Sequence, residues 1–446
     1  MKKNRSITFI LSLLGFGFIG KLLSMIARIL IVRSIGVEAM SIYSLVNPMM
    51  LLLITLTQLG LPTAIATLIS KHPERTKNIF ITGLILSIFI STSLMILTIF
   101  SGDIISNIII KNSQSKLTIF GLALLIPLVS LSSLLKGYFI GINRVEITTI
   151  SSIFEEVGRI IFYLLFIEFF IQKGVEYASF GAMLGVCIGE ISQTIYLIFQ
   201  SELKLYRKFK YLYHTEEYAN KCDSKNILSI SLPITFGRLI GSLTYFLEPI
   251  IFTSILLKLG DSISYITIEY GVLSSYVLPL LLMPGFFSYS LSNYLIPSMN
   301  IYIKNEDYTS AYKIFNKVLL ILLIIGAVAT SCFLIFPKQI LTLLYGNNIG
   351  FEMVQYLAIP ISIFYFESPL LSTMHVLNLT KKTTFITLSS CIIRLISLFI
   401  LTPKYKIYGV SISMILSILT TLLMSSFFVI REFSRHNIKS RISLQR

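Results

Sequence analysis

The chain has 446 residues, of which 54% are hydrophobic and only 13% are charged, with a formal net charge of +16 and a mean hydropathy of +0.82. A soluble protein of this size could not bury so much apolar surface, so the composition predicts an all-α polytopic membrane protein. The apolar runs are continuous, which excludes a transmembrane β-barrel, and the positive charge follows the loops, which argues against a nucleic-acid partner. The histidines and cysteines show neither metal-site nor nucleophile spacing, so we expect no metal, no cofactor and no enzyme activity.

Twelve transmembrane helices are predicted, each from an apolar run of roughly 20 residues or more, the length that crosses a bilayer. They cover residues 7–32, 41–69, 78–100, 117–140, 148–170, 178–200, 227–257, 268–296, 314–336, 354–377, 384–401 and 407–430. The longest polar loop divides them into two six-helix lobes. The predicted parts are an N-terminal lobe (1–201), a cytoplasmic inter-lobe loop (202–226), a C-terminal lobe (227–431) and a basic cytoplasmic tail (432–446). Lys and Arg are concentrated in alternate loops, and the positive-inside rule then places both termini in the cytoplasm.

The first span contains two cations, Lys21 and Arg28, which lie seven residues apart. Seven residues are close to two helical turns, so both side chains project from one face. A cation at mid-membrane costs on the order of 3 kcal/mol. This face is therefore predicted to look into a polar cavity or at a partner acid rather than at lipid.

Short sequence echoes relate the two halves of the chain. Gly20-Lys21-Leu22-Leu23 is echoed by Gly237-Arg238-Leu239-Ile240, and the spacing from Thr148-Thr149 to Arg159 recurs from Thr383-Thr384 to Arg394. Both halves begin on the same side of the membrane, so the predicted repeat is parallel. Transporters are commonly built in this way, with the substrate held between the halves.

The other charged residues within the spans can be interpreted either as internal ion pairs or as parts of a functional site. Glu155 and Glu156 lie four and three residues before Arg159, so all three share a helix face and can neutralise each other or take part in coupling. Lys21, Arg28, Arg238 and Arg394 have no acid within a helical turn of their own span. Either Glu248 and Glu367 pair with them across helices, or they form a cationic cavity for an anionic substrate.

Proline and glycine interrupt three of the predicted spans. They are Pro48, Gly60 and Pro62 in the second, Pro249 in the seventh, and Pro279 and Pro284 in the eighth. Such breaks are tolerated where neighbouring helices or a cavity satisfy the freed backbone groups. These residues are predicted to be hinges.

Several short motifs spread over nearly the whole chain are specific as a set. They include Arg33-Ser34-Ile35-Gly36-Val37-Glu38, Gly60-Leu61-Pro62-Thr63-Ala64-Ile65-Ala66, Lys136-Gly137-Tyr138-Phe139-Ile140-Gly141, Leu232-Pro233-Ile234-Thr235 and Leu344-Tyr345-Gly346. By these motifs the chain resembles the stage V sporulation protein B family. That family belongs to the polysaccharide exporter branch of the multidrug/oligosaccharidyl-lipid/polysaccharide (MOP, MATE-like) superfamily, which also includes MurJ-type lipid II flippases.

The resemblance implies two lobes facing each other across a central cavity, with alternating access. It implies a cargo of polyprenyl-pyrophosphate-linked glycan, a peptidoglycan or polysaccharide precursor for cell-wall or spore-cortex synthesis. Lys21 and Arg28 fall in the helix whose basic residues face the cavity in the flippase relatives. We therefore expect Lys21, Arg28 and Arg238 to bind the pyrophosphate, with Arg394 as a weaker candidate. The expected setting is a monomer in the cytoplasmic membrane, with the lipid bilayer, the lipid-linked oligosaccharide and cell-wall synthases as partners.

The chain departs from the family pattern in one respect, because relatives commonly have fourteen helices and twelve are predicted here. Two alternative functions remain open. The first is a cation-coupled multidrug exporter of the same fold. Such relatives use an aspartate in the first helix, whereas the first span here has cations and no acid. The second is a non-transporting membrane scaffold for envelope assembly, which would leave the intramembrane charges without a use.

Overall fold

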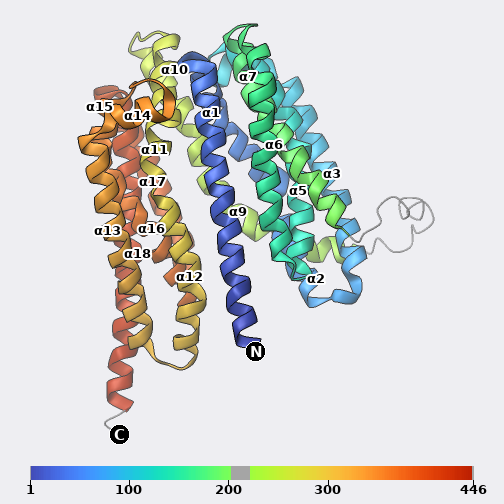
Figure 1. Ribbon diagram of the computed structural model, residues 1–446, viewed down its shortest axis with the longest axis vertical. Helices are drawn as coiled ribbons and strands as arrows, with labels where there is room; N and C mark the ends of the chain where they lie inside the picture. Colours follow the sequence, from blue (N-terminus) through green and yellow to red (C-terminus); the bar gives the residue numbers. More distant parts are fainter. Residues whose placement is uncertain (1, 202–220, 444–446) are drawn as a thin grey trace, which may run out of the picture. The chain divides into compact units, whose positions relative to one another are not determined.

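The computed structural model describes residues 2–201 and 221–443, and side chains are described for residues 15–201 and 224–436. Within this described part, the chain forms helices joined by short turns and no strand (Figure 1). Ten of its helical segments are long and apolar enough to cross a membrane. The first, Gly15–Lys71, contains two of the predicted spans, and α6 (Val145–Ile171) supplies one more, so all twelve predicted spans lie on helices. The predicted class, an all-α polytopic membrane protein, is confirmed.

The chain folds as two compact units, Met1–Phe246 and Leu247–Arg446. The border between them lies inside one helix, α9 (Lys221–Lys258). The predicted inter-lobe loop, 202–226, lies largely outside the described residues, as does the end of the predicted tail, 432–446. The predicted lobe boundaries and the cytoplasmic location of both termini therefore stay predictions.

The first unit contains six longer helices and the beginning of α9. They are α1 (Lys2–Gln58), α2 (Leu61–Lys71), α3 (Thr76–Phe100), α5 (Lys116–Gly141), α6 (Val145–Ile171) and α7 (Val175–Gln200). Short turns of helix, α4 (Gly102–Ile104), η2 (Ile105–Ile109) and η3 (Ser113–Ser115), connect α3 to α5. Between α2 and α3 lies η1 (Pro73–Arg75).

Helix α5 lies at the centre of the first unit, in contact with α2, α3 and α7. Small residues allow this close packing: a Cβ atom on Gly137 would lie 2.6 Å from the carbonyl oxygen of Pro62 in α2. Paired hydroxyls also join the helices, with Ser87 of α3 and Ser130 of α5 only 2.6 Å apart. Small residues and interhelical hydrogen bonds are the usual means of helix association in lipid, where no hydrophobic force brings helices together.

The second predicted span is broken where α1 ends and α2 begins. Gly60 has φ of +63°, and a Cβ atom there would lie 2.7 Å from the carbonyl oxygen of Ser231 in α9. Glycine is therefore required both for the left-handed backbone and for the approach of α9. A further kink, which the sequence did not predict, lies inside α1 at Gly36 (φ +74°).

The second unit contains the end of α9 and the helices that follow. They are α10 (Ile263–Gly271), η4 (Val272–Val277), α11 (Leu278–Leu282), α12 (Gly285–Lys304), α13 (Tyr308–Ile335), α14 (Pro337–Tyr345), α15 (Phe351–Ser362), η5 (Ile363–Phe366), α16 (Glu367–Val376), α17 (Thr380–Tyr405) and α18 (Ile407–Ser443). Its main core lies between α12, α13, α16 and α18, around buried residues such as Met299, Phe315 and Met374. The buried Tyr365 donates its hydroxyl to the carbonyl oxygen of Leu281, 2.6 Å away, and so ties η5 to α11.

Two polar contacts stabilise the ends of helices in the second unit. At the start of α13, the Asp307 carboxylate accepts hydrogen bonds from the Ser310 backbone N–H at 3.0 Å and the Thr309 hydroxyl at 2.7 Å. Hydrogen bonds from Ser310 and Thr309 lower the pKa of Asp307 to about 2. Between α17 and α18, Lys406 donates to Asp261 at 2.9 Å, and this hydrogen bond raises the pKa of Lys406.

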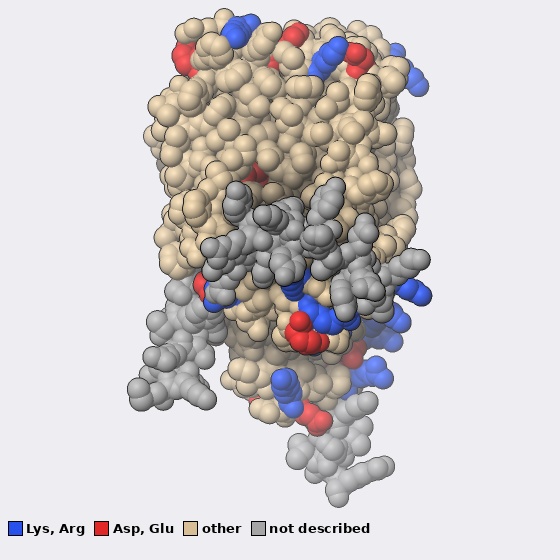
Figure 2. All heavy atoms as spheres, turned by 90° about the vertical axis from the view of Figure 1, so that its right-hand side faces the viewer, with Lys and Arg blue, Asp and Glu red and all other residues tan. Residues whose placement is uncertain are grey.

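Charged side chains lie mainly at the ends of the helices. Figure 2 shows one face of the molecule, where Lys, Arg, Asp and Glu gather at two ends; between them, the surface that grey atoms do not cover is almost free of charge. Lipid hydrocarbon requires such an uncharged surface. The few charges that lie deeper in the spans are therefore the candidate functional residues.

Candidate functional site

Both predicted cations of the first span lie on α1, but at different depths in the first unit. Lys21 is exposed, and Arg28 is half-buried. Helix α1 packs against α6, where the charge of Lys21 acts on Glu156 and the side chain of Ser24 lies within hydrogen-bonding reach of the same carboxylate. The positive charge of Arg28 lies close enough to the buried Tyr43 to interact with it electrostatically. Polar groups of α6 and of α1 itself thus lie near the two cations, and the cavity that the seven-residue spacing predicts stays a prediction.

The acids next to this face belong to an ion-pair group on α6. Arg159 Nη2 lies 2.8 Å from Glu155 Oε1, and Arg159 Nη1 lies 3.1 Å from Glu156 Oε2. All three side chains are at least four-fifths buried. The sequence reading in which these three residues neutralise each other on one helix face agrees with this geometry.

The polar group extends onto α7 and α5 through residues to which the sequence gave no role. The fully buried Gln193 of α7 donates its amide to Glu155 at 3.1 Å. One turn earlier on α7, the Glu190 carboxylate accepts a 2.6 Å hydrogen bond from the Ser132 hydroxyl of α5. The positive charge of Lys136, also on α5, attracts the same carboxylate. The i, i+3 spacing of Glu190 and Gln193 is the sequence signal that could have identified this extension.

Four cations and three acids form the charged part of this connected group among the described side chains. The cations are Lys21, Arg28, Lys136 and Arg159, and the acids are Glu155, Glu156 and Glu190. Arg159 is held by two acids of its own helix. Lys21 is the exposed member on α1 and can therefore reach a ligand.

Arg238 lies on the part of α9 that belongs to the first unit, and its side chain is exposed. Among the described residues, no acid lies within ion-pair distance of its guanidinium. Two glycines on the same helix, Gly237 and Gly241, have open space where a Cβ atom would be. Arg238 is thus accessible, which agrees with its predicted role but does not test it.

Arg394, on α17 in the second unit, is engaged in a buried ion pair. Its Nε lies 2.8 Å from Glu248 Oε2 of α9, and its Nη2 approaches the same oxygen. Glu248 is 4% exposed and also accepts a 3.4 Å hydrogen bond from Tyr270 of α10. Glu367 of α16 is a second acid close enough to act on Arg394. Of the two readings left open by the sequence, the structure shows pairing across helices for Arg394.

The predicted hinge residues fall into two groups. The helix is interrupted at Gly60 and Pro62, where α2 begins, and at Pro284, which precedes α12. Pro279 follows a π-helical segment, η4, the kind of irregularity that a missing backbone donor produces. By contrast, Pro48 and Pro249 lie inside helices that continue through them.

Metal binding can be judged for the described side chains alone. Among them, no group of three or more His, Cys, Asp or Glu residues is arranged to hold a metal ion. Glu155, Glu190 and Glu248 are instead engaged by Arg, Ser, Tyr and Gln side chains. The site is therefore one of fixed charges and hydrogen bonds.

Comparison with known proteins gives matches over most of the chain. Residues 8–302 match the family described as "Polysaccharide biosynthesis protein". The chain is 27% identical to stage V sporulation protein B of Bacillus subtilis (strain 168) over 431 residues, which cover 95% of this chain and 83% of that protein. It is 22% identical to sporulation protein YkvU of the same organism over 308 residues, covering 67% and 66%.

Among solved structures, the fold is similar to an inward-facing conformation of a multidrug resistance MATE family transporter of the MOP superfamily. The TM-score is 0.68 at 13% sequence identity, with 94% of this chain and 96% of the other covered. At this identity the likeness establishes a shared fold and leaves the cargo open.

Proposed function

Because the chain belongs to the polysaccharide biosynthesis protein family, we propose that it is an alternating-access flippase or exporter of a polyprenyl-pyrophosphate-linked glycan. The glycan would be a peptidoglycan or polysaccharide precursor that crosses the cytoplasmic membrane for cell-wall or spore-cortex synthesis. The names of two relatives, both sporulation proteins of Bacillus subtilis, favour an envelope role of this kind.

The observation that carries the proposal is the pair of cations on α1. Lys21 and Arg28 lie within a membrane-spanning segment, where each cation costs on the order of 3 kcal/mol unless it has a partner. Lys21 is exposed on this face, so a ligand that binds here must complement its positive charge.

A pyrophosphate fits this requirement better than a neutral or cationic cargo. It carries several negative oxygens, and charge-assisted hydrogen bonds from Lys and Arg are roughly twice as strong as neutral ones. In a partly dry site these contacts strengthen further, because the effective dielectric constant is lower than in water. In the proposal Lys21, Arg28 and Arg238 bind the pyrophosphate while the polyprenyl chain remains in lipid.

Arg394 takes second place in the proposal, because binding the cargo would require it to leave Glu248. The ion pair assigns Arg394 first to the stability of the second unit. The helix interruptions at Gly60 and Pro284 are where we place the bending that alternating access requires. Both termini are placed in the cytoplasm, where the basic loops of the sequence favour them.

The proposal is tested by translocation of lipid II, or of another lipid-linked oligosaccharide, in liposomes that contain the purified protein. Lys21→Ala, Arg28→Ala and Arg238→Ala are each expected to slow translocation by roughly 10-fold or more, because a hydrogen bond to a charged group contributes about 1.5–3 kcal/mol. The triple variant is expected to be inactive. Lys116→Ala, which removes an exposed cation paired with Asp103, is the matched control and should retain activity.

Normal translocation by the triple variant would overturn the role of these cations. The same liposomes, loaded with a cationic drug, test the rival function of a cation-coupled multidrug exporter. Drug transport without glycolipid transport would favour that rival. Transport of neither cargo, by protein that melts cooperatively, would favour the scaffold.

A further inference from the structure

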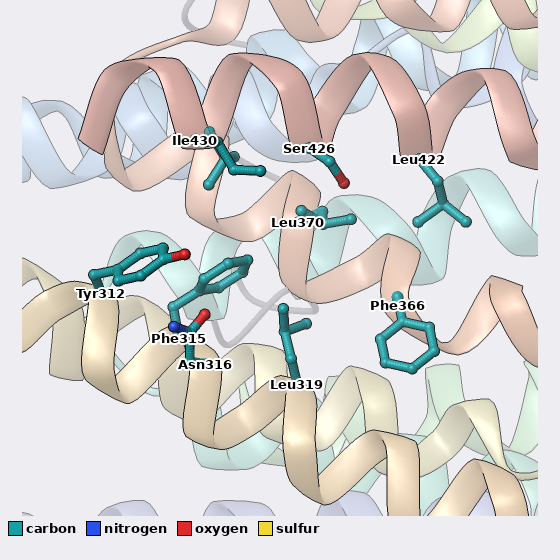
Figure 3. Close-up of a pocket in the computed structure, with 10 residues that line it drawn as sticks. Tyr312, Phe315, Asn316, Leu319, Phe366, Leu370, Leu422, Ser426 and Ile430 are labelled. Atoms are coloured by element: carbon teal, nitrogen blue, oxygen red, sulfur yellow. The ribbon is translucent and has the colours of Figure 1, made fainter. Parts of the chain in front are cut away.

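A groove lined mainly by apolar side chains lies within the second unit, between α13, α16 and α18. Its volume is about 300 Å³, and its lining includes Tyr312, Phe315, Leu319, Leu370, Leu422 and Ser426. Figure 3 shows these side chains directed into the space between the helices. We refer to this space as the α13–α18 groove. Pockets of this size and apolar character are typical of small-molecule sites.

The α13–α18 groove has a buried floor and an open rim. Phe315 and Leu370 are almost completely buried, whereas Ile430 is 53% exposed and Asn316 is also exposed. The groove therefore opens toward the lipid-facing side of α13 and α18. A ligand can enter it from the bilayer without any change in the packing of the core.

The groove lies within one leaflet of the bilayer. Helix α13 is capped by Asp307, and the groove runs along it from Tyr312 to Leu319. At a rise of 1.5 Å per residue this is a length of about 10 Å. One leaflet contributes about 15 Å of hydrocarbon, half of the thickness of the bilayer core. The groove is thus matched to part of one acyl chain.

Aromatic side chains mark the end of the groove that lies nearest the start of α13. The Phe433 ring of α18 packs against Tyr312 at 5.1 Å, and His436 stacks on Tyr308 at 3.9 Å. Tyrosine is enriched at the level of lipid headgroups. This end is therefore at the membrane interface.

Three exposed cations border the groove. Lys313 and Lys317 lie four residues apart on one face of α13, about 100° around the helix from the lining residues that they follow, and their long side chains can reach back to the rim. Lys313 also lies near Asp307, whose carboxylate is held by Ser310 and Thr309. Arg431 follows Ile430 on α18, the opposite rim. The nearest acid of α18, Glu432, is engaged by His436 at 3.4 Å and Arg435 at 4.0 Å. The rim is consequently complementary to an anion.

We propose that the α13–α18 groove binds one anionic phospholipid, with an acyl chain in the groove and the phosphate bound by Lys313, Lys317 and Arg431. Basic pockets between transmembrane helices recognise anionic headgroups in this way. The short groove favours a phospholipid over the polyprenyl chain of the cargo, because that chain is much longer than one leaflet is deep. This site is separate from the cations on α1, and its test does not depend on transport.

The test is a lipid titration of the purified full-length protein, followed by native mass spectrometry. The probes are phosphatidylglycerol and phosphatidylcholine with identical acyl chains. Lys313→Gln with Lys317→Gln is expected to weaken phosphatidylglycerol binding by about 30-fold, since each cation near an anionic lipid contributes about 1 kcal/mol. Binding of phosphatidylcholine should not change. Lys304→Gln, at the end of α12, removes an exposed cation at the same side and should have no effect.

A second pair of variants tests the groove itself. Asn316→Trp places a large side chain at the open rim and should abolish retention of both lipids. Leu323→Trp, on a lipid-facing position of the same helix that does not line the groove, is its control. Unchanged binding by Asn316→Trp, or equal losses in Lys304→Gln and the double lysine variant, would overturn the proposal. If polyprenyl phosphate displaced phosphatidylglycerol at equal concentration, the proposal would be overturned, and the groove would be assigned to the polyprenyl chain of the cargo instead.

Discussion

Replacing Glu248 by Gln should destabilise the second unit, because it removes the charge that compensates Arg394. The two side chains are joined by a 2.8 Å contact from Nε and a second contact from Nη2. The Arg394 side chain is 19% exposed and that of Glu248 is 5% exposed. In Glu248→Gln the guanidinium would keep its charge and lose its strongest partner.

The size of the effect follows from the burial of the pair. Removing one partner of a buried ion pair costs about 3–5 kcal/mol. We expect a cost at the lower end of this range, because the negative charge of Glu367 also attracts Arg394 and because the Arg394 side chain is partly exposed. For a unit of this size, about 3 kcal/mol corresponds to a decrease of roughly 6–12 °C in the melting temperature.

Circular dichroism melting in detergent measures this decrease. Lys406→Gln, which breaks the more exposed pair with Asp261, should lower the melting temperature much less and is the control. The double variant Glu248→Gln/Arg394→Leu should recover most of the loss, because replacing both partners removes the uncompensated charge. If Glu248→Gln melts like the unmodified protein, the pair does not stabilise the unit and the reasoning is refuted.

Three further predictions concern helix packing and helix ends. Gly60→Ala should cost about 2 kcal/mol, because it combines a left-handed backbone with a 2.7 Å approach to the Ser231 oxygen. Gly137→Ala should cost about 2 kcal/mol through overpacking against α2, whereas Gly241→Ala, with no atom within 4 Å of its Cβ, should be neutral or stabilising; equal melting temperatures would contradict this. The pKa of Asp307 is lowered to about 2, so its cap is intact above its ordinary value of 3.8 and is lost as the pH falls toward 2. Asp307→Asn should therefore flatten the decrease in melting temperature between pH 4 and pH 2, and an unchanged decrease would exclude this cap as its cause.

The helical architecture could be predicted from the sequence because the bilayer sets the length and polarity of every span. The twelve predicted spans lie within helical segments, although the second and the eighth are divided between successive helices. The chain belongs to the polysaccharide biosynthesis protein family, and its predicted resemblance to stage V sporulation protein B is confirmed at 27% identity. The kink at Gly36 could not be predicted, because glycine is common in membrane helices and only the backbone shows which one adopts a positive φ.

The candidate site was predictable where partners share a helix. The spacing of Glu155, Glu156 and Arg159 alone predicted their contacts. The pair of Glu248 and Arg394 joins residues 146 positions apart, so the sequence could offer it only as one of several partners across helices. Its geometry depends on how α9 and α17 pack, which no local pattern encodes.

Helix α9 has a mechanical consequence for the molecule. The chain passes from one unit to the other only once, between Phe246 and Leu247, and it does so inside this continuous helix. Three residues beyond the crossing, Pro249 lacks the backbone donor that would reinforce the helix. The helix therefore lacks one backbone hydrogen bond at this point. The neighbouring Glu248 offsets that loss within the second unit, because its ion pair with Arg394 fixes α9 to α17.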